Sequence, residues 1–317
     1  MATNTDDVIF LKDGSPVTGE MMIAPNGKLV TQFYGIPFAE PPVGKLRFRK
    51  PVPKAPWRNT LNANVPPNSC IQCLDTYFDD FVGATMWNAN TEQSEDCLYL
   101  NVFVPEKPDP TKRLAVMVWV YGGGFATGTS TIDVYDGKIF SAEEKIIIVP
   151  FNYRVSIFGF LFMGTADAPG NMGLWDQNLA LKWVHTNIAQ FGGDNTRITL
   201  FGESAGAASV NLQMFSEKST PYFHRAIIQS ASATATWAIV PTGIIFSKYN
   251  KIFQKEKCVR DEEQYFFCSY IEKLWNCKRK VATRSFLSGT KSGHPCAISW
   301  TSRGRPWSIE TSSQKKN

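Results

Sequence analysis

The feature that most constrains the fold is a short apolar segment that runs directly into a serine flanked by glycines. Residues 198–201 have the composition of a buried strand, Gly202-Glu203-Ser204-Ala205-Gly206 follows at once, and residues 207–215 are compatible with a helix. A G-x-S-x-G motif between a strand and a helix is typical of a tight turn that projects the serine hydroxyl from the edge of a sheet. The sequence therefore predicts an α/β protein with a nucleophile at Ser204.

The two glycines of this motif have a mechanical role. Side chains two positions before and two positions after the serine would clash in so tight a turn, so we expect Gly202 and Gly206 to be required there. The turn also places the hydroxyl at the N-terminus of a helix, whose partial positive charge favours a developing anion. The motif therefore predicts both a nucleophile and part of the environment that activates it.

Other segments extend the same α/β pattern. Nearly continuous apolar runs at residues 114–121 and 146–152 predict strands buried on both faces, and residues 98–104 and 225–229 also have the pattern of strands. Residues 173–190 carry apolar side chains at helical spacing. This succession of strands and helices predicts a mostly parallel sheet flanked by helices. Residues 25–70, rich in proline and glycine, are expected to be extended chain and turns.

A second glycine-rich segment, Gly122-Gly123-Gly124, directly follows the predicted strand at residues 114–121. Backbone N–H groups of this segment, together with that of Ala205, could converge on the carbonyl oxygen of a tetrahedral intermediate. Donors of this kind each contribute roughly 10²–10³ in rate. Taken alone, three glycines are also compatible with a flexible turn.

A serine nucleophile needs a general base, which is usually a histidine oriented by a carboxylate. In this fold the acid and the histidine follow the serine in the chain. Here only His224 and His294 follow Ser204; His224 opens a predicted strand and His294 lies in an irregular basic stretch. The sequence therefore shows a nucleophile and an oxyanion hole, but no convincing base.

Charge and composition exclude several classes of protein. With 43% hydrophobic and 19% charged residues, the chain is not a disordered, collagen-like or coiled-coil protein. No apolar run approaches the roughly 20 residues of a membrane span, so we expect no transmembrane segment. Residues 241–317 carry 15 basic and 6 acidic side chains, against 18 and 22 in the first 240. Such asymmetry can mark a nucleic-acid or membrane tail, or a segment of different origin from the body; we expect no nucleic-acid partner.

Three regions are expected along the chain. Residues 1–24 form an N-terminal lead with a short strand pair, residues 25–240 form the α/β body, and residues 241–317 form a divergent basic tail that is partly disordered. The first residues contain neither the basic nor the apolar region of a signal peptide, so none is expected. None of the seven cysteines has the spacing of a zinc site, and we expect neither a metal nor an organic cofactor.

Several stretches together resemble a known family. The chain resembles the type-B carboxylesterases, and within them the cholinesterases, above all those of the invertebrate acetylcholinesterase branch, over roughly residues 25–240. The resemblance rests on residues 33–42 (FYGIPFAEPP), 94–102 (SEDCLYLNV), 121–125 (YGGGF), 152–155 (NYRV), 191–194 (FGGD) and 202–206 (GESAG). It implies the N-terminal portion of an α/β-hydrolase fold and hydrolysis of acetylcholine or related choline esters through an acyl-enzyme on Ser204. It also assigns the role of oxyanion donors to Gly123, Gly124 and Ala205.

The resemblance also implies roles for substrate-binding residues. Trp87 matches the family's choline-site tryptophan, whose indole face attracts a quaternary ammonium. Glu203 matches the carboxylate that helps to hold the cation, Asp75 an acidic residue at the mouth of the gorge, and Trp237 an acyl-pocket tryptophan. Without the surrounding motifs, a packing residue would be the favoured interpretation of Trp87, and a solvated loop residue is nearly as good an interpretation of Asp75.

The cysteines match the family only in part. Cys70 and Cys97 match its first disulfide, which closes the loop that carries Trp87. Cys258 matches the first cysteine of a second disulfide, with Cys268 slightly favoured over Cys277 as its partner. By resemblance, an extracellular or cell-surface location is expected.

The resemblance fades after Val240, and the chain stops before the family's glutamate and histidine. We therefore expect a C-terminally truncated product, by splicing or by gene prediction, that is inactive alone. Two other functions stay open at this point: a general carboxylesterase, and a non-catalytic cholinesterase-like adhesion or interaction protein. The intact motif around Ser204 argues against the second.

Overall fold

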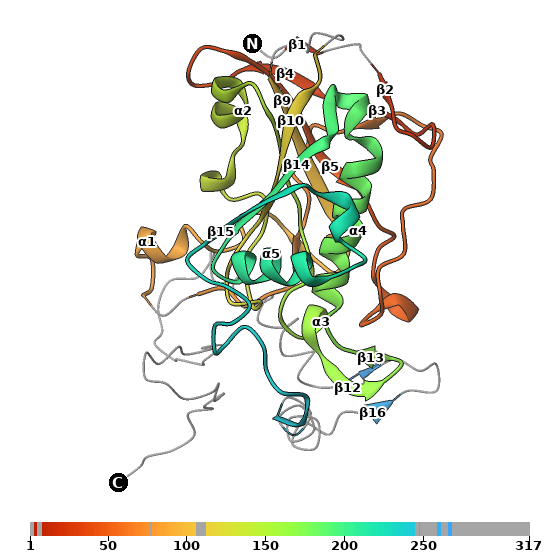
Figure 1. The fold of residues 1–317 in the computed structure, drawn as a ribbon, viewed down its shortest axis with the longest axis vertical. Helices are drawn as coiled ribbons and strands as arrows, with labels where there is room; N and C mark the ends of the chain where they lie inside the picture. Colours follow the sequence, from red (N-terminus) through yellow and green to blue (C-terminus); the bar gives the residue numbers. More distant parts are fainter. Residues whose placement is uncertain are drawn as a thin grey trace, which may run out of the picture.

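The computed structural model describes residues 3–4, 8–75, 78–105, 112–244, 247, 259–260 and 266–267. Its centre is a twisted eight-stranded sheet, which runs vertically through Figure 1. In spatial order the strands are β1 (Thr3–Asn4), β4 (Glu20–Ile23), β5 (Leu29–Pro37), β9 (Tyr99–Pro105), β11 (Ile147–Pro150), β10 (Leu114–Val120), β14 (Gly193–Glu203) and β15 (Arg225–Gln229). Cys258, Cys268, Cys277 and His294 lie outside the described residues, so the second disulfide stays a prediction.

The sheet has an antiparallel half and a parallel half. β1, β4, β5 and β9 pair antiparallel in succession, and β9 pairs antiparallel with β11. From β11 onward, through β10 and β14 to β15, all pairings are parallel. The predicted α/β class is confirmed, and its parallel part is the half that carries the serine motif.

The nine-residue strand β5 is a correction to the expectation of extended chain and turns at residues 25–70. Its register shifts between Phe33 and Ile36, and Gly35 within this shift has a φ of +71°. A bulge with glycine in the left-handed region breaks the regular alternation by which a strand is recognised in a sequence.

Helices cover both faces of the sheet. The helices are α1 (Val82–Thr85), α2 (Lys138–Glu144), α3 (Ser156–Phe160), α4 (Met172–Asn187) and α5 (Ala205–Phe215). Figure 1 shows α2 on one side of the sheet and α4 on the other, and α5 packs against β14 and β15. Four 3₁₀ turns are η1 (Gly44–Leu46), η2 (Asp133–Tyr135), η3 (Ile188–Phe191) and η4 (Thr220–Tyr222).

In the described residues, smaller sheets lie outside this central sheet. One has three strands, β2 (Ile9–Phe10), β3 (Pro16–Thr18) and β6 (Leu61–Asn62), and three others are pairs. The pairs are β7 (Ser69–Cys70) with β8 (Gln93–Ser94), β12 (Phe162–Thr165) with β13 (Ala168–Pro169), and β16 (Val259–Arg260) with β17 (Phe266–Phe267).

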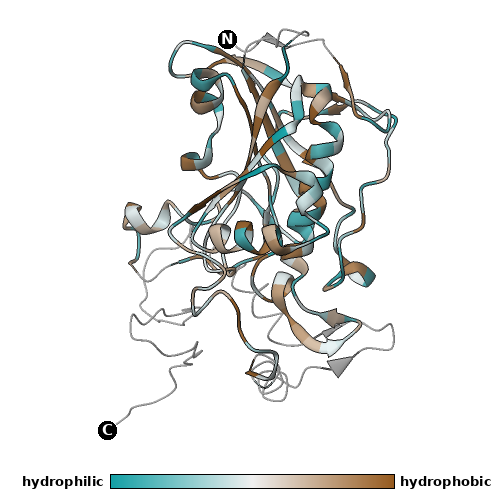
Figure 2. Ribbon diagram, in the orientation of Figure 1, coloured by the Kyte–Doolittle hydropathy of each residue, from teal (hydrophilic) through white to brown (hydrophobic). Residues whose placement is uncertain are grey.

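The core lies between the parallel strands and α4. Val116, Val118 and Val120 on β10 are fully buried, as are Leu181 and Val184 on α4. In Figure 2 the central strands are coloured as hydrophobic, whereas much of α4 is coloured as hydrophilic. Because the core holds these strands rigidly, the loops at their carboxyl ends have fixed positions, and the serine motif lies there.

Candidate active site

Ser204 lies at a strained turn between β14 and α5. Its φ is 55° and its ψ is −122°, which is unusual for a residue with a side chain. Such a conformation costs of order 1–3 kcal/mol and persists only where the surrounding structure enforces it. Here the Ser204 N–H donates to the carbonyl of Gln229 on β15 (3.0 Å), and its own carbonyl accepts from the N–H of Ala208 (3.0 Å).

The flanking glycines allow α5 to approach the end of β10. A Cβ on Gly202 would lie 2.6 Å from the Val120 carbonyl oxygen, and one on Gly206 would lie only 2.0 Å from the same atom. Neither distance is possible for a real side chain. The clash expected from the sequence is therefore present, and it is a clash with the neighbouring strand β10.

The triple-glycine segment packs directly against this turn. A Cβ on Gly122 would lie 2.8 Å from the Glu203 carbonyl oxygen and 3.1 Å from Cβ of Ser204. Gly123 has a φ of +107° and Gly124 one of +62°. Within the described residues, no acceptor takes the N–H of Gly123 or Gly124. These two donors and the N–H of Ala205, the first residue of α5, are available for a ligand beside Ser204.

Aromatic rings connect this turn to Trp87. The ring of Trp87 is centred 6.4 Å from that of Tyr135, which is 5.1 Å from Trp119, and Trp119 is 4.8 Å from Phe201 on β14. Burial and, to a smaller extent, the negative charge of Glu203 together raise the pKa of Tyr135 to about 12. Tyr135, Trp87 and the Glu203 carboxylate therefore lie in one neighbourhood.

Tyr135 was missed in the sequence. It lies in a short 3₁₀ turn without periodicity, and nothing in its local pattern indicates that it packs near Trp87 or is reached by the charge of Glu203. Tyr135 lies in the connection between β10 and β11, so its position depends on the path that this connection takes in the folded chain.

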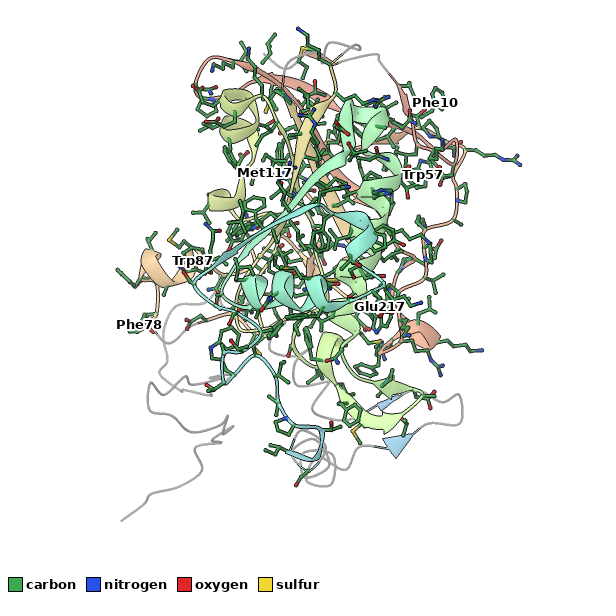
Figure 3. All side chains as sticks on the ribbon, viewed as in Figure 1. Phe10, Trp57, Phe78, Trp87, Met117 and Glu217 are labelled. Carbon is green, nitrogen blue, oxygen red and sulfur yellow. A yellow bond between two sulfur atoms is a disulfide. The ribbon has the colours of Figure 1, made fainter. Side chains whose placement is uncertain are left out.

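The loop that carries Trp87 is closed at its base and braced inside. The expected disulfide between Cys70 and Cys97 is present, and β7 and β8 pair beside it. Further out, the Asn88 side chain accepts the Asp75 N–H (2.7 Å) and donates to the Asp75 carbonyl (2.9 Å). This pair of bonds holds Asp75 next to Trp87, which is 50% exposed. Figure 3 shows Trp87 on the sheet side of α1 and Phe78 on its outer side.

Trp237 packs near the end of the triple-glycine segment. Its ring is centred 6.3 Å from that of Phe125, the residue after Gly124, and Phe125 is 5.0 Å from Phe160. These rings provide aromatic bulk beside the triple-glycine segment. Asp75 and Trp87, by contrast, are held on the loop that the Cys70–Cys97 disulfide closes.

Comparison with known proteins agrees with this geometry. The sequence profile of the carboxylesterase family matches residues 5–307. The chain belongs to the carboxylesterase family. It is 65% identical over 252 residues to acetylcholinesterase 1 of Caenorhabditis briggsae and 66% identical over 252 residues to that of Caenorhabditis elegans, with 80% of this chain and 41% of each relative covered. A cholinesterase of Mus musculus is 54% identical over 238 residues, with 75% of this chain and 39% of the relative covered.

This carboxylesterase chain thus spans about two fifths of the length of the curated relatives it matches. The fold agrees with the family's α/β-hydrolase architecture, in its N-terminal part.

The described histidines lie at the opposite end of the sheet from Ser204. The His224 imidazole accepts the N–H of Ile198, six residues before Ser204 along the strand, which is roughly 20 Å of strand. His185 is near Tyr222, beside η4, and its pKa is lowered by burial and by the nearby charge of His224. Within the described residues, no histidine is therefore placed to take a proton from Ser204.

The described residues contain neither a candidate metal site nor a helix suited to a membrane. Among the residues that the structure describes, no group of three or more His, Cys, Asp or Glu side chains could hold a metal ion. No helix in the same residues has the length and apolar character to cross a bilayer.

Proposed function

We propose that this chain carries the nucleophile, the oxyanion hole and the cation site of a serine esterase that hydrolyses acetylcholine or related choline esters. One observation carries the proposal: a strained serine at a helix N-terminus packs against a triple-glycine segment, and the residue before it, Glu203, acts electrostatically on Tyr135, whose ring packs near that of Trp87. The names of the relatives, acetylcholinesterase and cholinesterase, support the same substrate class.

In this mechanism the Ser204 oxygen attacks the ester carbonyl carbon while a general base takes the hydroxyl proton. The N–H groups of Gly123, Gly124 and Ala205 stabilise the negative oxygen of the tetrahedral intermediate. The intermediate collapses, the protonated alcohol leaves, and an acyl-enzyme remains on Ser204. Attack by water on this ester releases the acid and restores the hydroxyl.

The cation site is suited to a quaternary ammonium. Such an ion cannot donate hydrogen bonds, so it is recognised by aromatic faces and by negative charge. A cation over an indole ring contributes roughly 0.5–2 kcal/mol, and Trp87 presents such a ring with half of its surface exposed. Glu203 supplies the negative charge. Trp237 and Phe125, beside the triple-glycine segment, would limit the acyl group to a small one.

Turnover by this chain is expected to be slow. Because no described histidine is near Ser204, the base is not among the described residues, and loss of a triad's base costs several orders of magnitude in rate. Phosphonylation of Ser204 needs the nucleophile but no hydrolysis of an acyl-enzyme, and its product accumulates even when the reaction is slow. Covalent labelling of Ser204 over a long incubation is therefore a more sensitive test than turnover.

The test uses a fluorophosphonate probe, which phosphonylates activated serines, followed by mass spectrometry of the peptide that contains residue 204. We expect labelling of the chain, no labelling of Ser204→Ala, and protection by tetramethylammonium that is lost in Trp87→Ala. For any measurable hydrolysis, acetylthiocholine should be preferred over its uncharged 3,3-dimethylbutyl analogue. Absence of labelling would refute the nucleophile, and equal rates for the two esters would refute the cation site.

We also propose an extracellular or cell-surface location. A structural disulfide such as Cys70–Cys97 forms and persists in an oxidising compartment. Secretion of the protein into the medium of expressing cells, followed by mass mapping of the disulfide, tests this location.

A further inference from the structure

We propose that Gln72 is a positioning residue, which holds the loop that carries Trp87 against the turn that carries the oxyanion donors. The inference rests on the proposed function, because it concerns the same site. It arises from one buried side chain that lies between two loops distant in the sequence. The relative position of these loops decides whether the cation and the ester carbonyl of one substrate can be bound at the same time.

Gln72 is only 5% exposed, and its side-chain amide is fully engaged with backbone groups. Its nitrogen donates to the carbonyls of Gly128 (2.8 Å) and Cys70 (2.9 Å), and its oxygen accepts the Gly128 N–H (2.8 Å). Gln72 and Gly128 are thus bonded in both directions. A carboxamide offers an N–H donor and a carbonyl acceptor, as a peptide group does. The Gln72 side chain therefore bonds to the backbone of Gly128 as a neighbouring strand would.

Gly128, the partner of Gln72, is connected to the triple-glycine segment by a short stretch of chain. The Gly123 carbonyl accepts the N–H groups of Ala126 and Thr127, so residues 123–127 form one tight turn that ends at Gly128. Gly128 has a φ of +117°, and a Cβ there would lie 2.5 Å from the Tyr121 ring. The turn therefore has little conformational freedom, so a displacement of Gly128 also displaces Gly123.

On its own side, Gln72 lies two residues beyond Cys70 in the disulfide-closed loop. Its backbone N–H donates to the Gln93 side chain (3.0 Å), which ties the outgoing and returning strands of the loop together. From this point the chain leads through Asp75 to Trp87. Gln72 is consequently placed where the loop leaves the body. Loss of its amide would loosen the loop from the turn, because the bonds that remain, from Ser69 to Thr129 and between Asn90 and Thr131, lie after the turn.

Gln213 provides a matched control. It is 3% exposed, and its side-chain amide also bonds to backbone and polar groups, donating to the carbonyl of Leu174 and to the Gln177 side chain. It lies on α5 nine residues after Ser204, or about 13 Å along the helix. Replacement of either glutamine by methionine keeps the length of the side chain and removes the amide, but only Gln72 joins the two loops.

The experiment compares Gln72→Met and Gln213→Met in the full chain. Hydrogen exchange followed by mass spectrometry reports peptides that cover residues 70–97 and 122–131. We expect exchange in both segments to accelerate about tenfold or more in Gln72→Met and to stay unchanged in Gln213→Met, although both variants melt at lower temperature. Unchanged exchange in Gln72→Met, or equal acceleration in both variants, would overturn the proposal.

A second measurement separates positioning from mere folding. The rate of fluorophosphonate labelling depends on the oxyanion turn, and the tetramethylammonium concentration that protects depends on Trp87. Because a displacement of about 1 Å can cost 10²-fold in rate, Gln72→Met should label at least tenfold more slowly and need several-fold more tetramethylammonium. Gln213→Met should match the wild type in both; an equal loss there would count against positioning.

Two outcomes are distinguishable by design. If the wild-type chain is not labelled at all, the proposed function fails, while the exchange experiment still decides whether Gln72 joins the two loops. If Gln72→Met does not fold, Gln72→Glu replaces it, because it keeps the side-chain shape and the acceptor for the Gly128 N–H but has no donor for the two carbonyls. The same acceleration of exchange is then expected, and its absence would overturn the inference.

Discussion

The tightest contact at the serine turn yields a quantitative prediction for Gly206→Ala. The added Cβ would lie 2.0 Å from the Val120 carbonyl oxygen and 2.8 Å from that of Tyr121. Real Cβ atoms are essentially never closer than 3.0 Å to such an atom, so α5 must retreat from β10 by about 1 Å. Both obstacles are backbone atoms of a buried sheet and cannot move aside as a flexible side chain would.

This retreat should affect both stability and chemistry. Overpacking of a close-packed site costs typically about 1–3 kcal/mol, and a clash with rigid backbone belongs at or above the top of that range. Since α5 begins one residue after Ser204, the same shift moves the hydroxyl by a similar amount, and a 1 Å misplacement can cost about 10²-fold in rate. We expect urea denaturation to show a loss of about 3 kcal/mol or more, and fluorophosphonate labelling to slow about 100-fold.

Gly243→Ala is the matched control, because a Cβ at Gly243 meets no atom within 4 Å. It should leave labelling unchanged and alter the free energy of unfolding by less than about 1 kcal/mol. If Gly206→Ala unfolded at the same urea concentration as the wild type and was labelled at the same rate, the argument that α5 must touch β10 would be wrong.

Three further predictions concern the surroundings of the serine. Asn88→Ala removes both bonds to Asp75 and should raise the tetramethylammonium concentration needed for protection about fivefold, with little change in the labelling rate itself. Replacement of Cys70 and Cys97 by serine opens a loop with a sequence separation of 27 and should cost about 3–4 kcal/mol in urea denaturation, under oxidising conditions only. Tyr135 has its pKa raised from 10.0 to about 12, so it stabilises the fold fully below pH 10 and loses that contribution as the pH rises toward 12; Tyr135→Phe should show a smaller loss of stability between pH 10 and 12.

A different result would contradict each of these three predictions. Asn26→Ala removes an exposed amide that bonds to Glu143 and serves as the control for Asn88→Ala, so equal effects of the two would argue against a local brace. Equal stability of the cysteine variant and the wild type under oxidising conditions would argue against the disulfide. Identical alkaline profiles for Tyr135→Phe and the wild type would show that Glu203 and burial do not hold the tyrosine neutral.

The serine turn could be predicted from the sequence because all its parts are adjacent in the chain. Strand β14, the turn and helix α5 follow one another without a break, and the glycines on either side of Ser204 report a steric limit that any such turn must meet. The buried strands β10 and β11 were equally visible, since strands covered on both faces are continuous apolar runs.

Elements that depend on distant partners were less visible. Strand β5 was not recognised, because a bulge at Gly35 interrupts its alternation, and the antiparallel half of the sheet therefore appears only in the structure. Gln72 has an ordinary local sequence, and only its burial against Gly128 gives it a role.

The residues of the chain by themselves predicted the candidate nucleophile, the glycine-rich segment beside it and the class of fold, because each of these follows from backbone sterics or hydrophobic pattern over short distances. Only the tertiary structure decided that Tyr135 packs near Trp87 within reach of the Glu203 charge, and that His224 lies at the far end of the sheet from Ser204. The physical reason is that side chains far apart in sequence meet through the order and direction of strands, which long-range packing selects and no local pattern encodes.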